Sequence, residues 1–210
     1  MIQTNRLISY FEPPVAPIRD KQGRTVRPAS LMPQTSLTLG QVYQLITANE
    51  PLRQLTVQVR QASDLGLAKR SLLPYVTPFG TFSRRRCENL LAFSGLLPID
   101  VDKLESGEEA EHIKQALFSD PYLDARLVFV SPSGKGVKAF IPWPSHRLTE
   151  EDNPARLASV YTTQAMEYVR CMYELHPDSR RRGVDVSGKD VVRACYLCHD
   201  EKALISVKYE

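Results

Sequence analysis

The most constraining feature of the sequence is an apolar, β-prone run that two acids interrupt at alternate positions. The run is Gly95–Leu104, and its acids are Asp100 and Asp102. Because successive side chains of a strand point to opposite faces, both carboxylates project from one face while Ile99 and Val101 lie on the other. Neighbouring carboxylates at the edge of a core repel each other and lose hydration, which a cation or a proton must offset. The pattern predicts a strand with a pair of oxygen ligands suited to Mg²⁺ or Mn²⁺, although a strand that runs into an acidic turn also fits.

Length and composition indicate one soluble domain with a sizeable core. The chain has 210 residues, and 42% of them are hydrophobic, which argues against disorder. No apolar run approaches the roughly 20 residues of a membrane span, and the N-terminus lacks the apolar segment of a signal peptide. We therefore expect a cytoplasmic protein with no membrane partner. The cysteines are too few and too scattered for a disulfide framework, which fits a reducing compartment; they are Cys87, Cys171, Cys195 and Cys198.

Charge is distributed unevenly along the chain. Residues 1–90 carry 12 lysines and arginines against 5 acids, a net charge of +7, whereas residues 91–210 have a net charge of −4. This asymmetry favours a polyanion held by the first part and metal ions held by the second, against the alternative of ordinary surface variation.

The positions of the prolines and of the helix-capping residues predict an arm followed by one larger domain. Proline and polar residues dominate 1–36, where we expect one short strand near 7–11. The remaining residues, 37–210, form the larger domain, with a basic part over 37–90 and a part over 91–210 that carries the candidate metal-binding acids. Capping and periodicity predict helices at about 39–48, from Pro51 to before Asp64, from Ser106 through Leu117, and at 154–175; strands are expected at 126–130, 137–143, 184–186, 191–198 and 203–207.

Cations and aromatic residues are interleaved between positions 69 and 86. Prolines and a glycine predict irregular or edge-like structure there. The mixture suits a nucleic-acid groove, in which cations meet phosphates and rings stack on bases, while a solvated arginine turn is the alternative. The candidate nucleic-acid-binding cations are Lys69, Arg70, Arg84, Arg85 and Arg86.

The hairpin predicted between 126 and 143 has a turn of small residues, hydroxyls and a lysine. Backbone N–H groups in such a turn can form a nest for phosphate oxygens, with Lys135 and Lys138 supplying charge. The turn is not a Walker A loop, because the spacing differs and a strand follows it. Ordinary hairpin chemistry explains the same residues equally simply.

Two further patterns lie near the C-terminus. Asp185 has apolar neighbours at a strand-like position, so it resembles the earlier pair of acids. The segment Cys195–His199 matches the c-type haem pattern, but haem attachment of that kind belongs to exported proteins. Zinc held by Cys195, Cys198 and a distant cysteine lacks a second pair with ligand spacing, so small apolar core residues are the favoured reading.

The order of these motifs resembles the archaeo-eukaryotic primase superfamily, whose core has hhhDhD/E, s-x-H and hD motifs. More closely, the chain resembles the BT4734-like, or VirE N-terminal, domain of primase–helicase proteins in bacteria and mobile genetic elements. The resemblance implies an α+β, primase-polymerase-like fold: a mixed, largely antiparallel, RRM-like sheet flanked by helices, with an N-terminal helical or irregular part. The matching segments are Ser94–Leu104, Asp120–Tyr122, Phe129–Lys138 and Val184–Cys195, with weaker likeness at 38–46 and 77–86.

The resemblance also implies two-metal nucleotidyl transfer in DNA replication. Two Mg²⁺ or Mn²⁺ ions would be bound by Asp100, Asp102 and Asp185, and the basic 69–86 segment would take a single-stranded DNA template. A helicase domain or protein is an implied partner. The phosphates of a nucleoside triphosphate would be held by Ser131, Ser133, Lys135, Lys138 and Arg193.

One departure from the superfamily pattern keeps other functions open. Lys138 stands where s-x-H has histidine, and a lysine can neutralise a triphosphate only as a point charge. A catalytically degenerate module that binds nucleic acid is therefore the main alternative to a primase or primase-polymerase. A metal-dependent nuclease is the third, because D-x-D also serves hydrolysis.

Overall fold

A computed structural model describes residues 3–4, 6–143, 153–175, 182–185 and 189–207. The expected mixed α+β class is confirmed, and nearly all of the strand pairs are antiparallel. Among the described helices, none has both the length and the apolar character that crossing a bilayer requires. The helices are α1 (Leu39–Ala48), α2 (Glu50–Gln61), α3 (Leu65–Leu72), α4 (Gly107–Ser119) and α5 (Pro154–Met172), with a 3₁₀ turn at Cys87–Asn89.

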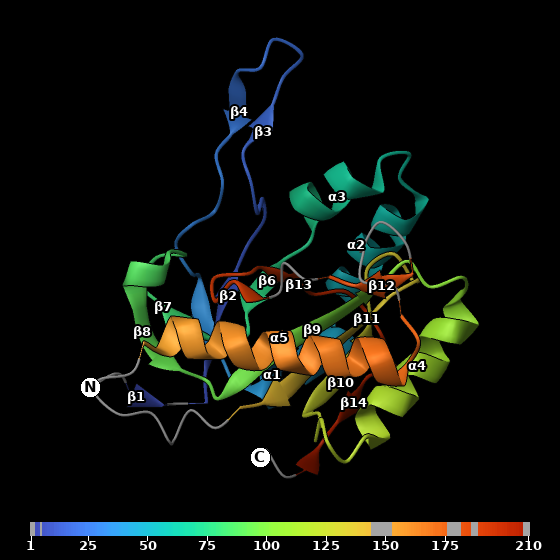
Figure 1. Cartoon of the computed structure of the whole chain (residues 1–210). Coiled ribbons are helices and arrows are strands. Elements are labelled where there is room, and N and C mark those ends of the chain that lie inside the picture. The colour runs from blue at the N-terminus through green and yellow to red at the C-terminus, as the bar shows by residue number, and fades with distance from the viewer. Residues whose placement is uncertain (1–2, 5, 144–152, 176–181, 186–188, 208–210) are drawn as a thin grey trace.

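A five-stranded antiparallel sheet carries the acidic strand near its centre (Figure 1). Its order is β12 (Gly183–Val184), β9 (Leu96–Asp102), β11 (Val137–Pro142), β10 (Leu127–Val130) and β14 (Leu204–Ile205). The hairpin expected around 131–136 is present, because β10 and β11 pair in antiparallel register.

The two faces of this sheet have different roles. Odd-numbered residues of β9, such as Ile99 and Val101, pack in a core with α4 and α5. Leu96 packs on the opposite side, in a second core with α1 and α2. By alternation, Asp100 and Asp102 share the face of Leu96, so the acids are held by a strand whose other face is anchored in the first core.

The N-terminal strands join strands from later in the chain in two further sheets. A four-stranded sheet has the order β13 (Cys195–Tyr196), β6 (Tyr75–Thr77), β2 (Ile8–Phe11) and β5 (Thr35–Leu37). A three-stranded sheet joins β1 (Gln3–Thr4), β8 (Leu90–Phe93) and β7 (Gly80–Phe82), in which β1 and β8 are parallel. Strands β3 (Ile18–Arg19) and β4 (Thr25–Arg27) pair only with each other and form a ribbon that projects from the body (Figure 1).

Several local predictions are confirmed and others are wrong. The helix at 39–48 and the strand near 7–11 occur as predicted, but residues 18–27 add the ribbon that the sequence did not reveal. The predicted long strand over 191–198 is wrong, because only Cys195 and Tyr196 are paired. The helix predicted at 154–175 is present as α5 but ends at Met172, and two of its apolar residues, Val160 and Met172, are 45% and 60% exposed. Val186, which was expected to extend the strand before it, lies outside the described residues.

The cysteines behave as small apolar residues where they are buried. Cys195 and Cys198 are buried, and burial raises the pKa of each thiol to about 12. Cys87 and Cys171 are exposed, and within the described residues no cysteine belongs to a group of potential metal ligands.

Gly136 is expected to be essential to the packing of the hairpin turn against β9. A Cβ there would lie 2.5 Å from the Val101 carbonyl oxygen and 2.8 Å from Ser131 Oγ. The Gly136→Ala variant should lose about 1 to 3 kcal/mol of unfolding free energy in urea titrations, because the turn must move off the strand. The control is Gly107→Ala, whose Cβ would meet only an atom at 3.7 Å at the start of α4 and should leave stability unchanged or raised. Equal stability of the two variants would contradict this packing.

Candidate active site

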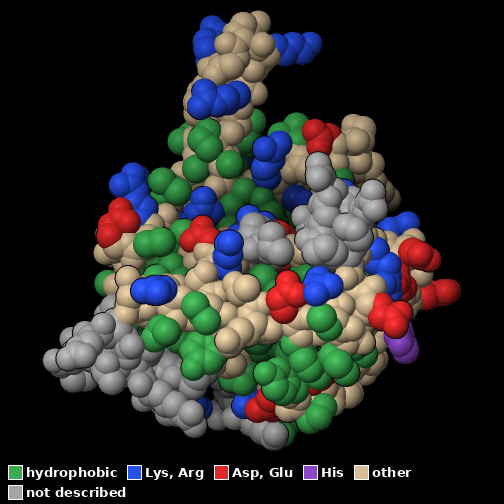
Figure 2. Space-filling view, in the orientation of Figure 1, with side chains coloured by type: hydrophobic (Ala, Val, Ile, Leu, Met, Phe, Trp, Pro, Cys, Tyr) green, Lys and Arg blue, Asp and Glu red, His purple; other side chains and the backbone are tan. Residues whose placement is uncertain are grey.

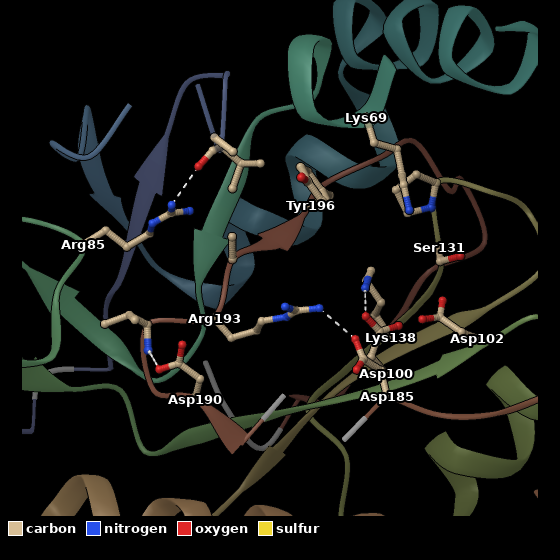
Figure 3. Close-up of a pocket in the computed structure, with 15 residues that line it drawn as sticks. Lys69, Arg85, Asp100, Asp102, Ser131, Lys138, Asp185, Asp190, Arg193 and Tyr196 are labelled. Atoms are coloured by element: carbon tan, nitrogen blue, oxygen red, sulfur yellow. Dashed lines mark hydrogen bonds and ion pairs between the residues drawn. The ribbon is translucent and has the colours of Figure 1, made fainter. Parts of the chain in front are cut away.

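A cavity of about 440 Å³ opens on the acidic face of β9. Figure 3 shows Asp100, Asp102 and Asp185 with Lys138 on one side, and Lys69, Arg85 and the Tyr196 ring on the other. The N-terminal segment also reaches the cavity, through Val15 and Ala16. The charged and aromatic lining residues are Lys69, Arg85, Asp100, Asp102, Lys138, Asp185, Asp190, Arg193 and Tyr196.

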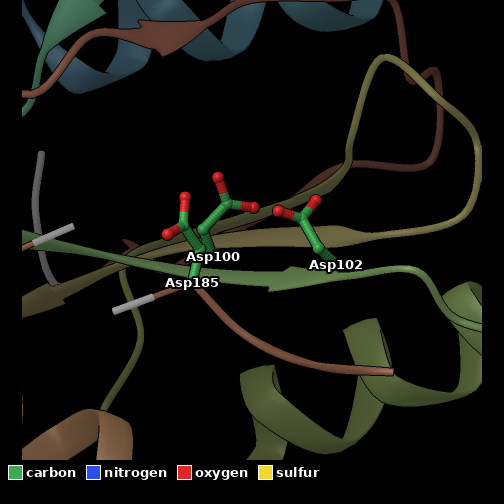
Figure 4. Close-up of side chains that lie close together, drawn as sticks. All are labelled: Asp100, Asp102 and Asp185. Atoms are coloured by element: carbon green, nitrogen blue, oxygen red, sulfur yellow. The ribbon is translucent and has the colours of Figure 1, made fainter. Parts of the chain in front are cut away.

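Three acids from distant parts of the chain meet at this cavity. Asp100 and Asp102 extend from β9, while Asp185 directly follows β12, which pairs with β9 so that Gly183 lies opposite Asp102. The Asp185 N–H donates to the Asp100 carbonyl oxygen at 2.8 Å, which fixes the neighbouring backbones. One carboxylate oxygen from each acid lies within 4.8 Å of the others (Figure 4). The convergence expected of a shared cation site is therefore present.

The chemistry of these acids fits a divalent cation. Asp100 Oδ1 is buried and has no hydrogen-bond partner in the described part of the chain. Burial, and then the charges of Asp100 and Asp185, raise the pKa of Asp102 to about 6, against an opposing effect of Lys138 and Lys69. A buried oxygen without a donor and a carboxylate that resists ionisation are both stabilised when hard cations bind. The residues present therefore fit Mg²⁺ or Mn²⁺.

Two of the three acids also have cationic partners from the chain itself. Lys138 Nζ forms an ion pair with Asp100, directly across the β9–β11 register. Arg193 Nη2 lies 2.7 Å from Asp185 Oδ2. Burial by itself lowers the pKa of Lys138, but the charges of Asp100 and Asp102 and the other raising effects together outweigh it, and the pKa lies above its ordinary value. Lys138 therefore stays an ammonium at neutral pH and acts as a fixed charge.

Comparison with known proteins adds a family to this geometry. A family described as "BT4734-like, N-terminal domain" matches residues 67–204. The chain belongs to the BT4734-like family. This match contains all three acids and the β10–β11 hairpin, while the projecting ribbon lies before it.

Other comparisons are weaker. The chain is similar in structure to the "Polymerase Domain from Mycobacterium tuberculosis Ligase D in complex with DNA", with a TM-score of 0.37 and 16% sequence identity. The similar region covers 63% of this BT4734-like chain and 49% of that polymerase domain. The chain thus spans about half the length of the solved structure. No curated protein matches the chain significantly.

Of the residues predicted to hold phosphates in this BT4734-like domain, some line the cavity and others point away from it at the hairpin turn. Ser131 is buried at the cavity wall, beside Lys138. Ser133 stands behind it, because the two hydroxyl oxygens are 3.0 Å apart and Ser133 Oγ accepts the Lys135 N–H at 3.2 Å. Lys135 Nζ donates to the Glu105 carbonyl oxygen at 3.0 Å and is not among the residues that line the cavity. Arg193 does line it, through its ion pair with Asp185.

The residues predicted to hold nucleic acid are divided in a similar way. Lys69 and Arg85 line the cavity, and each lies over an aromatic ring. Arg70 instead donates from Nε to the carbonyl oxygen one helical turn back, at 3.3 Å. Arg84 and Arg86 are exposed and are not among the cavity-lining residues.

Tyr196 is a cavity residue that sequence reasoning missed. Its ring lies 5.9 Å from Lys69 Nζ and faces the same cavity as the acids (Figure 3). The missed signal is strand alternation: Cys195 is buried, so its neighbour in β13 must point to the other side. A lone tyrosine beside a core cysteine was treated as part of a buried strand.

Metal binding by this BT4734-like domain is expected to depend on pH through Asp102. Its pKa of about 6 in the folded protein exceeds its ordinary value of 3.8, so below pH 6 a proton competes with the cation. Affinity for Mn²⁺, measured by calorimetry, should rise about tenfold per pH unit up to pH 6 and level off above pH 7.

The raised pKa of Asp102 also determines how the stability of the metal-free protein changes with pH. The contribution of protonated Asp102 to folding stability is full below pH 4 and is lost as pH rises through 6, because the folded state then holds a buried charge beside two other acids. Metal affinity that stays constant from pH 5 to pH 7 would contradict the assignment of Asp102.

Proposed function

We propose that this domain is a template-directed nucleotidyltransferase of the primase-polymerase type. It would join nucleoside triphosphates to a 3′-hydroxyl along a single-stranded DNA template. The observation that carries the proposal is the meeting of Asp100, Asp102 and Asp185 at a cavity whose other wall is cationic. Carboxylates and cations side by side match a reaction that brings metal ions and phosphates together.

The three acids would hold two divalent ions. Bound there, such ions supply positive charge that favours ionisation of the attacking hydroxyl and stabilises the pyrophosphate that leaves. Two observations support this role. A bound cation would give the buried Asp100 Oδ1 a partner, and it would stabilise the ionised form of Asp102, whose pKa is raised.

The cations of the cavity would hold the triphosphate. Lys138 and Arg193 each pair with an acid, so each is positioned where a phosphate oxygen can replace a carboxylate as its partner. In the reaction the 3′-hydroxyl gives its proton to solvent water, its oxygen attacks the α-phosphorus, and the bond between the α-phosphorus and the bridging oxygen of the leaving pyrophosphate breaks. Lys138 does not accept the proton of the hydroxyl, because it is already an ammonium at neutral pH.

Template binding is assigned to the wall away from the acids. Lys69 and Arg85 offer charge to the phosphates of a strand, and Tyr196 offers a ring on which a base can stack. Stacking tolerates any base, so this wall suits a template whose sequence varies.

The test is incorporation of labelled nucleotides on a primed and an unprimed single-stranded template, with Mg²⁺, Mn²⁺ or EDTA. The proposal expects products only with metal, triphosphate and template together. Strand cleavage without triphosphate would instead assign the acids to a nuclease.

A second candidate function is a binding module that does not polymerise. The ion pairs of Lys138 and Arg193 favour it, because they neutralise two of the three acids without any metal. Nucleic-acid affinity that is unchanged by metal, with no incorporation under any condition, would select this function.

A further inference from the structure

The ribbon of β3 and β4 is the most prominent feature that the site does not use. It projects from the body and pairs with no other strand of the described chain (Figure 1). Its residues from Arg19 to Arg27 are exposed apart from a half-buried Asp20 at the turn. A ribbon that buries almost nothing contributes little to the core, so its own hydrogen bonds must hold its structure.

The tip of the ribbon is internally braced. Asp20 Oδ1 accepts the N–H groups of Gln22 and Arg24 at 2.9 Å, and Asp20 Oδ2 lies 2.8 Å from Arg24 Nε. Gly23 sits in the left-handed region at φ 79°, and its carbonyl oxygen accepts from Arg19 Nη1 at 2.8 Å. The turn is therefore a defined structure rather than a loose loop.

The base of the ribbon is fixed at the rim of the cavity. Val15, three residues before β3, lines the cavity, and its carbonyl oxygen accepts from Arg85 Nη2 at 2.7 Å. At the end of β4, Arg27 donates to the carbonyl oxygens of Pro13 at 2.8 Å and Ser71 at 3.3 Å. The ribbon is therefore held by the same arginine that lines the predicted template wall.

Charge and composition indicate what the ribbon contacts. Residues 17–29 carry four cations and one acid, and Figure 2 shows Lys and Arg side chains gathered on the projecting ribbon. The same residues include no aromatic side chain, so they offer no ring on which the bases of a single strand can stack. Cations without rings suit the phosphates of a double helix, and a two-stranded ribbon has the width that a major groove admits.

We propose that the β3–β4 ribbon grips double-stranded nucleic acid beside the cavity, through phosphate contacts of Arg19, Lys21 and Arg24. This inference rests on the proposed function only in taking nucleic acid as the partner of the domain. The cavity, with the Tyr196 ring, would then hold single strand, while the ribbon holds the duplex next to it.

The test compares binding of a hairpin duplex with a single-stranded tail and of the single strand alone, in EDTA and without nucleotide. The variant Arg19→Gln/Lys21→Gln/Arg24→Gln removes up to three phosphate contacts, so the slope of log affinity against log salt should fall in magnitude by about 2 to 3 for the duplex. Single-strand affinity should change by less than about twofold, because the cavity is unaltered. The control Arg53→Gln/Arg156→Gln/Arg170→Gln removes the same charge from α2 and α5 and should leave the duplex slope unchanged.

A second measurement does not depend on affinity loss. A fluorophore on Lys21→Cys, in a Cys87→Ser/Cys171→Ser background that removes the exposed thiols, should change its emission when duplex is added and not when single strand is added. No duplex binding by the unaltered protein, an unchanged slope, or equal losses for duplex and single strand would each overturn the proposal. Neither measurement involves catalysis. Duplex binding without nucleotide incorporation would therefore contradict the proposed polymerase activity and still support duplex binding by the ribbon.

Discussion

Asp102→Asn is expected to lower nucleotide incorporation by about a thousandfold or more while raising the stability of the metal-free domain. Activity falls because an amide removes one charged ligand from a set of three that must hold divalent ions. Stability rises because Asp102 ionises against burial and against Asp100 and Asp185, which hold its pKa near 6. A shift of that size corresponds to a gain of up to about 3 kcal/mol above pH 6 when the charge is removed. Opposite changes in activity and stability are the signature of a site in which function strains the fold.

The measurement pairs primer extension with urea unfolding of the same preparations in EDTA at pH 7.5. The matched control is Glu108→Gln, which makes the same change of charge on an exposed residue of the first turn of α4 and should alter neither quantity appreciably. Incorporation within tenfold of the unaltered protein would remove Asp102 from the catalytic set. A loss of both activity and stability would show that the residue mainly supports the fold.

The central part of the fold could be predicted because its signals are local and periodic. Alternation along β9 placed Ile99 and Val101 in the core and the two acids together on the other face, as the structure has them. The helix at 39–48 was equally readable, since Thr38 and Gln41 form a capping box at its start.

The rest depended on contacts that a sequence does not display. The helix predicted from Pro51 does end before Asp64, but the next helix was not predicted, although the Asp64 side chain accepts the Leu67 N–H and begins α3. The ribbon escaped notice because its strands are exposed on both faces and show no alternation. Lys135 and Lys138 could not be told apart by sequence, although the β9–β11 register sends one to the acids and leaves the other at the Glu105 carbonyl.

The pairing of Lys138 with Asp100 leads to the second large effect. Lys138→Met is expected to lower the unfolding free energy of the metal-free domain by about 3 to 5 kcal/mol, because it leaves Asp100 buried without its counter-charge. The side chains of Lys138 and Asp100 are only 9% and 18% exposed, so water replaces the lost partner only in part. Urea unfolding in EDTA at pH 7.5 measures the loss. The control Lys135→Met changes an exposed lysine of the same hairpin and should alter stability by less than about 1 kcal/mol.

Two further variants separate the ion pair from simple packing. Asp100→Asn/Lys138→Met removes both charges and should recover most of the lost stability, whereas a packing defect would persist in the double variant. Mn²⁺ should also stabilise Lys138→Met more than it stabilises the unaltered domain, since a cation entering the unaltered site must displace the ammonium from Asp100. If Mn²⁺ stabilises both proteins equally, Lys138 and the metal do not share Asp100, and the exchange of partners proposed for triphosphate binding fails with it. If the rescue is selective, the lysine acts as a resident counter-ion that keeps the acids folded until metal and nucleotide arrive.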